Sequence, residues 1–122
     1  MKLHVKIPEG LKVHFETELR LAKETMFKDQ LQVSWRHLER AHILGQAWPF
    51  QHTKAHWRMM GFALRIKSGK EILGQIPRLI VGGVKSFVGE IPVGNTGGAD
   101  VPPLKPMEIP EDLLQILKKY QS

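Results

Sequence analysis

Apolar residues recur at intervals of three and four along the first half of the chain, and this spacing limits the possible folds more than any other feature of the sequence. Such spacing places apolar side chains on one face of an α-helix, whereas a β-strand requires strict alternation. It predicts helices over about residues 9–27, 30–45 and 51–67. No strand pattern, heptad run or strict internal repeat accompanies them. We therefore expect an all-α fold.

Residues that start and stop helices mark the boundaries of these segments. Pro8 fits the first turn of the first helix, where its missing N–H has no intrahelical partner to lose. Asp29 is expected to cap the second helix through its side chain, and Gly45 suits the end of that helix. The third helix is expected to end at Ser68 and Gly69.

The second half of the chain is more interrupted. A fourth helix is expected to begin near Lys70, and Pro77 predicts either a kink in it or a later start. Residues 89–110 are rich in Gly and Pro and show no period, so they predict a long loop that is functional or packed on the surface. Pro110 then opens a last short helix that runs to about Lys119.

Length and composition agree with one globular domain. The 122 residues are 42% hydrophobic and 25% charged, and the absence of Cys excludes a disulfide framework, a thiolate metal site and a cysteine nucleophile. The apolar stretch 71–94 is interrupted by Arg78, Lys85 and Glu90, so no membrane span is expected. We expect a single helical domain over residues 1–122 in the cytoplasm. Its architecture is predicted to be a four- to five-helix bundle with a long Gly/Pro-rich C-terminal loop and a short terminal helix.

The net charge of +6 is unevenly distributed along the chain. All of it arises in residues 35–70, where Glu39 is the only acidic residue. A basic face of this kind can bind an acidic protein, a nucleic acid or an anionic lipid, and it is also common as a merely solvated surface. Because no nucleic-acid reading motif is present, this face favours an acidic protein as a partner and disfavours nucleic acid.

Ionisable side chains fall on the apolar faces of all three predicted helices. The set comprises Glu18 on the first helix, His42 on the second, and His52 and His56 on the third, with Glu39 and Gln46 at the edge of the second stripe. Short turns make successive helices antiparallel neighbours, so these side chains are expected to converge at one end of the bundle. Buried carboxylates and imidazoles must be paired, hydrogen-bonded or bound to a metal.

The spacing within this set suits a shared metal ion. Glu39 and His42 are three residues apart and His52 and His56 are four apart, so each pair can present two ligands to one ion. Imidazole with carboxylate suits divalent Zn, Fe, Mn, Ni or Cu rather than Ca or Mg. The proposed ligands are His42, His52, His56 and either Glu39 or Glu18.

Two other interpretations of the same residues stay open. One is a hydrogen-bonded Glu–His network that fixes the register of the helices. The other is an enzyme without metal, in which a Glu–His pair works as acid and base. The sequence does not decide between catalysis and a structural, storage or sensing role.

Two further motifs carry weaker signals. The GNTGG segment at residues 94–98 offers backbone N–H groups to an anion, although such clusters are more often tight turns. We also expect this segment to pack over the metal site as a lid. Glu71, Gln75 and Arg78 share one flank of the fourth helix, which favours a salt bridge between helices.

Five segments of the chain match a known family pattern. They are WRHLERAHILGQ (35–46), HTKAHWRMMG (52–61), EILGQIPR (71–78), GNTGGADV (94–101) and PMEIPEDL (106–113). Together they resemble an uncharacterised bacterial family, domain of unknown function 3703, over nearly the whole chain after residue 10. The resemblance implies a shared site but no established activity. The positions that correspond to the family motifs are Glu39, His42, Gln46, His52, His56, Glu18, Glu71, Gln75 and Asn95, and Thr96 lies in the same GNTGG motif.

Overall fold

The computed structural model describes residues 6–76, 97–98 and 107–120, and within these residues the chain is all-α, as predicted. The helices with defined bounds are α1 (Glu9–Phe27), α2 (Leu31–Gly45), α3 (Pro49–Ile66) and α5 (Glu111–Tyr120). Residues 69–76 form a further helical segment. No helix among the described residues is long and apolar enough to cross a membrane.

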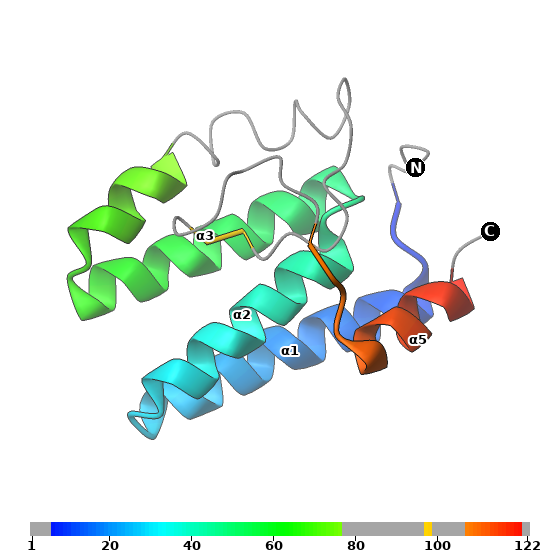
Figure 1. The fold of residues 1–122 in the computed structure, drawn as a ribbon, viewed down its shortest axis with the longest axis horizontal. Helices are drawn as coiled ribbons and strands as arrows, with labels where there is room; N and C mark the ends of the chain where they lie inside the picture. Colours follow the sequence, from blue (N-terminus) through cyan, green and yellow to red (C-terminus); the bar gives the residue numbers. More distant parts are fainter. Residues whose placement is uncertain (1–5, 77–96, 99–106, 121–122) are drawn as a thin grey trace.

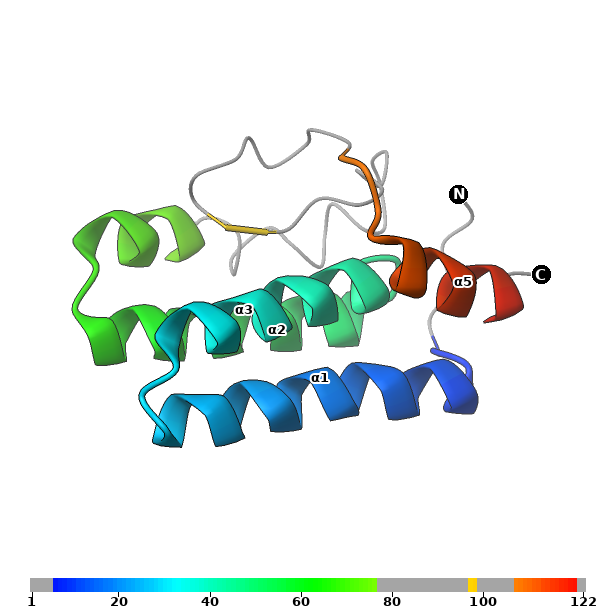
Figure 2. The ribbon, with the colours of Figure 1, turned by 60° about the horizontal axis from the view of Figure 1, so that its bottom comes forward.

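The first three helices form the body of the molecule. α1 and α2 pack as an antiparallel hairpin, and α3 packs against α2 (Figure 1). In Figure 2, α1 lies below α2, and α5 lies close to the beginning of α1. The helical residues 69–76 turn back from the end of α3 and lie beside it in both views. This turn brings residues 69–76 towards the side of α3 that carries two of the predicted site residues.

Two apolar clusters form the core. The first joins α1, α2 and α3 through the predicted stripes, with Phe15 and Met59 fully buried at its centre. The second joins the start of α1 and the end of α2 to α5, with Leu11, Leu44 and Leu113 fully buried. The fully buried apolar residues lie where one helix meets another. Helical periodicity therefore identified the inward faces of the helices correctly.

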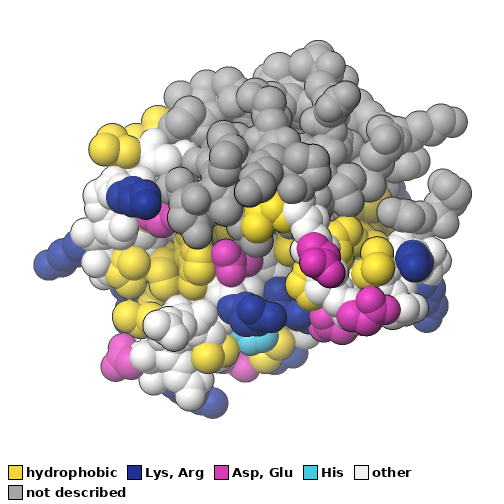
Figure 3. Space-filling model, in the orientation of Figure 1, with side chains coloured by type: hydrophobic (Ala, Val, Ile, Leu, Met, Phe, Trp, Pro, Cys, Tyr) yellow, Lys and Arg dark blue, Asp and Glu magenta, His cyan; other side chains and the backbone are white. Residues whose placement is uncertain are grey.

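A network of charged side chains fastens α5 to the α1–α2 hairpin. The Nδ1–H of His37 donates to Glu18 Oε1 at 2.7 Å, and Arg40 Nε donates to the same oxygen at 3.0 Å. The two terminal nitrogens of Arg40 donate to the carboxylate of Asp112 on α5. These hydrogen bonds raise the pKa of Arg40 above its ordinary value and lower the pKa of Asp112. Figure 3 shows basic and acidic side chains next to one another over α2 and α5, with a histidine beside them.

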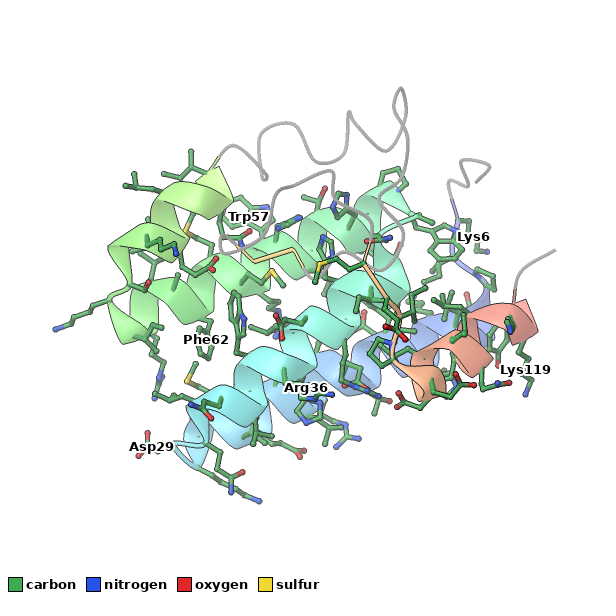
Figure 4. All side chains as sticks on the ribbon, viewed as in Figure 1. Lys6, Asp29, Arg36, Trp57, Phe62 and Lys119 are labelled. Carbon is green, nitrogen blue, oxygen red and sulfur yellow. The ribbon has the colours of Figure 1, made fainter. Side chains whose placement is uncertain are left out.

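The turn between α1 and α2 differs from the prediction. Asp29, which lies at this turn (Figure 4), does not cap α2; the N-cap is Gln30, and no side chain caps the helix. Instead Asp29 adopts the left-handed conformation, with φ of 57°. The N–H groups of Asp29 and Gln30 donate to the carbonyls of Met26 and Thr25, which closes the end of α1. Lys67 ends α3 in the same way, with φ of 58°.

Candidate metal centre

Three imidazole rings from α2 and α3 meet inside the bundle. The Nε2 atoms of His42 and His56 are 3.1 Å apart, and those of His56 and His52 are also 3.1 Å apart. His42 and His56 are each 2% exposed, and His52 is half-buried. The structure therefore brings together the three histidines that the sequence placed on inward faces.

The spacing of these nitrogens matches the requirements of one metal ion. One ligand nitrogen from each ring lies within 4.8 Å of the other two. Around a tetrahedral ion with metal–nitrogen bonds of about 2.0–2.1 Å, neighbouring ligand atoms are about 3.3 Å apart. The ring planes are inclined by 60–72° to one another, so the rings present edges to a common centre and do not stack. This group could hold a metal ion with little rearrangement.

The turn between α2 and α3 sets this geometry. Trp48 is extended and Pro49 occupies the first turn of α3, where a proline is well tolerated. Gly45 closes α2, and a Cβ at this position would come within 2.8–2.9 Å of atoms of Phe15 and Gln51. The missing side chain therefore allows the end of α2 to approach α1 and α3 closely. The last turn of α2 and the first two turns of α3 consequently lie at the same level.

Gln75, in the helical segment 69–76, fixes the proton of one histidine. Its side-chain N–H₂ group donates to the carbonyl of Gly97 and to a carboxylate oxygen of Glu71, both at 2.9 Å, and neither oxygen can donate. The amide oxygen of Gln75 therefore faces His56 Nδ1, 2.6 Å away, and accepts its proton. Gln75 is fully buried. A neutral His56 thus keeps an unprotonated Nε2 directed at the other two histidines.

Gly97 lies directly against the ring of His42. A Cβ added to Gly97 would come within 2.5–2.8 Å of three atoms of that ring, and its φ of 85° is also unfavourable for other residues. Of the predicted GNTGG motif, Gly97 and Gly98 are buried, whereas Asn95 and Thr96 lie outside the described residues. The described part of this motif therefore contributes a close backbone approach to the site.

The predicted position of Glu18 requires a correction. Glu18 is buried, as expected, but its carboxylate binds His37 and Arg40, and it is not among the described residues whose ligand atoms converge. The reason is that Glu18 meets α2 at His37 and Arg40. At 100° per residue, these positions point to a different side of the helix from His42. We therefore do not retain Glu18 as a metal ligand.

The remaining candidates have different positions. Glu39 is half-buried on α2, and it lies outside the converging group within the described residues. Gln46 is buried directly after α2. Glu71 accepts a hydrogen bond from Gln75, four residues later on the same helical segment. Arg78 lies outside the described residues, so its expected salt bridge is not described.

Sequence reasoning missed the role of Gln75 beside His56 and the role of Gly97 beside His42. For Gln75, the available signal was its spacing of four residues from Glu71, which indicates contact between those two side chains. The carbonyl of Gly97 is 22 residues further along the chain, beyond the reach of any helical spacing. For Gly97, the available signal was the Gly-Gly pair, which permits a positive φ.

No curated protein and no solved structure matches this chain. A family model described as a protein of unknown function, DUF3703, matches residues 9–117. This match contains the three histidines together with Gln75 and Gly97. The chain therefore belongs to the DUF3703 family, as its motifs had indicated.

Proposed function

We propose that this protein binds a divalent transition metal ion through the Nε2 atoms of His42, His52 and His56. The observation that carries the proposal is the convergence of these three nitrogens, with separations of 3.1 Å from His56 to each of the others. A set of imidazole ligands suits Zn, Fe, Mn, Ni or Cu. Glu39, three residues before His42, stays the proposed carboxylate ligand on sequence spacing alone.

The position of the proton on the His56 ring favours a bound metal ion over a network made of hydrogen bonds alone. Because Gln75 accepts the Nδ1 proton, a neutral His56 has one lone pair at Nε2, and one lone pair accepts one N–H. Yet the Nε2 atoms of both His42 and His52 lie at hydrogen-bond distance from it. A metal ion among the three nitrogens would use all three lone pairs at once.

Gln75 also resembles the supporting residues of known metal sites. Metal-bound histidines usually donate their second N–H to a carboxylate, a carbonyl or water, which orients the ring and fixes its tautomer. The amide oxygen of Gln75 gives His56 such a partner, and it adds no charge to the site. A bound ion with an open position could act as a Lewis acid or activate water, which leaves both catalytic and non-catalytic roles within the proposal.

The direct test is elemental analysis of the purified, tag-free protein before and after treatment with a chelator. We expect about one equivalent of a transition metal per chain, as a single three-histidine site would hold. His42→Ala and His56→Ala should each lose this metal, whereas His14→Ala, a matched change on α1 outside the group, should keep it. No metal uptake by the unaltered protein on reconstitution, or full metal content in both site variants, would overturn the proposal.

The alternative function is a non-catalytic interaction module that uses the basic face, residues 35–70, to bind an acidic partner or nucleic acid. Five of the seven basic side chains there are exposed: Arg36, Arg58, Arg65, Lys67 and Lys70. Arg40 and Lys54 are instead engaged in ion pairs. Binding that weakens steeply with salt would favour this alternative. The cytoplasmic location and the acidic partner stay predictions from the sequence.

A further inference from the structure

A groove lies between α1 and α3, away from the three histidines. It is an open hollow with a volume of 380 Å³, and its wall includes the apolar side chains of Leu19, Met26 and Phe62. The ion pair between Lys54 and Glu16, 2.9 Å long, joins α3 to α1 one turn before the first groove residues of each helix. The pair therefore lies beyond the first groove residues of both helices and does not line the cavity.

Large aromatic side chains stand at the rim of the groove. Trp57 is 61% exposed and Phe27 is 69% exposed, although both line the same cavity. Trp57 and Phe62 come from the same helix, α3 (Figure 4). Large apolar side chains that gather around a concave surface are a feature of sites for apolar ligands.

The charged residues of the groove all have the same sign. They are Lys23 on α1 and Arg58 and Arg65 on α3, and all three are exposed. Among the described residues, no carboxylate lines the cavity. The guanidinium of Arg65 also stands 5.9 Å from the ring centroid of Phe27, so a cation lies directly beside the apolar surface. This combination is complementary to a ligand with an apolar body and an anionic head.

Gly61 is an exposed residue of the groove that leaves open space beside its backbone. It lies inside α3 and lines the cavity, and a Cβ at this position would meet no atom within 4 Å. A glycine inside a helix is less stable than an alanine, and packing against the described residues does not explain its presence here. The open volume at Gly61 is therefore available to a ligand.

We propose that this groove binds an alkyl carboxylate of the medium-chain fatty acid class. The alkyl chain would lie against Leu19, Met26 and Phe62, and the carboxylate would meet Arg58 or Arg65 at the rim. The cavity volume falls within the range of roughly 300–1,000 Å³ that is usual for small-molecule sites.

The test is a calorimetric titration of the full chain with decanoate below its micelle concentration, compared with decyltrimethylammonium. Both probes carry the same alkyl chain, but their heads have opposite charge. We expect saturable, one-to-one binding of decanoate and at least about tenfold weaker binding of the cation, because the rim is cationic. Replacement of one guanidinium in Arg58→Gln should weaken decanoate binding about two- to fivefold, as for an exposed ion pair.

Gly61→Leu supplies the decisive variant, because its side chain would occupy the cavity without meeting other atoms near the backbone. We expect decanoate binding to fall at least about tenfold, with helix content unchanged. Gly69→Leu is the matched control, since a Cβ at Gly69 also meets no atom within 4 Å and Gly69 does not line the groove. It should bind decanoate normally.

Two outcomes would overturn the proposal: equal binding of both probes, or unchanged decanoate binding by Gly61→Leu. The result is independent of the metal site, because none of the three histidines lines the groove. His56→Ala should therefore bind decanoate like the unaltered protein.

Discussion

Gln75 connects the candidate metal ligands to a distant part of the chain through a single side chain. Gln75→Met keeps the size of the residue but removes the acceptor for His56 and the donor to Gly97. We expect affinity for Zn²⁺ to fall about 10–100-fold, the usual effect of losing a residue that orients a ligand. Competition with a chromophoric chelator measures this affinity. Gln115→Met, at an exposed position of α5, is the control, and an unchanged affinity in Gln75→Met would exclude the orienting role.

Gly97 tests how closely the backbone must approach His42. In Gly97→Ala the new methyl group would overlap the His42 ring, and the left-handed backbone adds a cost of roughly 1–2 kcal/mol for a residue with a side chain. We expect a lower free energy of unfolding in urea and weaker metal binding. Gly69→Ala, where the space is open and no positive φ is required, should retain both properties. Equal stability of the two variants would show that the contact with His42 is loose.

For single residues, the sequence predicted which side chains point into the core better than it predicted which residues they contact. Periodicity correctly directed His42, His56 and Glu18 inward, because the direction of a side chain follows from the geometry of its own helix. Glu18 nevertheless binds His37 and Arg40, since a helical wheel does not state which part of a neighbouring helix a side chain will meet.

Among the helices, α5 is attached by the apolar packing of Leu113 and Leu117 and by an ion pair between Asp112 and Arg40. Arg40 lowers the pKa of Asp112 in the folded chain, so Asp112 contributes stability above its unfolded pKa and loses it as the pH falls through the lower folded value. Because the Asp112 side chain is 61% exposed, this contribution is at most about 1 kcal/mol. Asp112→Asn should therefore reduce the free energy of unfolding by about 0.5–1 kcal/mol at pH 7.

Urea denaturation across pH measures this effect. The difference between the two proteins should shrink as the pH falls through the lowered pKa of Asp112, and it should disappear once the carboxyl is protonated in both folded and unfolded chains. Asp29→Asn is the control, because Asn also tolerates the left-handed conformation of that turn. A difference for Asp112→Asn that persists at low pH would assign the loss to packing instead of charge.

Helix positions were predictable, but the chemistry of their ends was not. The predicted first helix has the observed bounds of α1, and the third begins at Pro49, two residues before the predicted start. Asp29 misled the prediction because aspartate is a favoured N-cap and also one of the few L-residues that tolerate the left-handed conformation. The same position between two helices admits either role, and tertiary packing decided between them.

For the molecule as a whole, the proposed metal should act as a stabiliser. An ion that binds only the folded chain stabilises it by about 2.7 kcal/mol at 100 times its dissociation constant. We expect Zn²⁺ to raise the melting temperature by several degrees, and Mg²⁺ to leave it unchanged because imidazoles suit it poorly. Differential scanning calorimetry with and without His56→Ala measures this. An equal rise in the variant would assign the stabilisation to a different site.

The helical class followed from periodicity, and the convergence of His42, His52 and His56 followed from short turns between antiparallel helices. The contacts that Gln75 and Gly97 make with two of these histidines did not follow from the sequence. Helical spacing relates residues that are a few positions apart, so it identified His52 and His56 as one pair. The approach of Gly97 to His42 joins distant segments, and only the folded chain specifies it. The DUF3703 match agrees with the recognised motifs and adds no activity to them.

The three histidines lie within residues 42–56, on either side of a single turn. Closing so short a segment costs little chain entropy, so an ion could bind as soon as the α2–α3 turn has formed. Gln75 and Gly97 are synthesised after the three histidines. They would therefore pack against a metal site that already holds its ion. In a chain that emerges from its N-terminus, metal capture would thus precede completion of the core, and the ion would act as a template for folding.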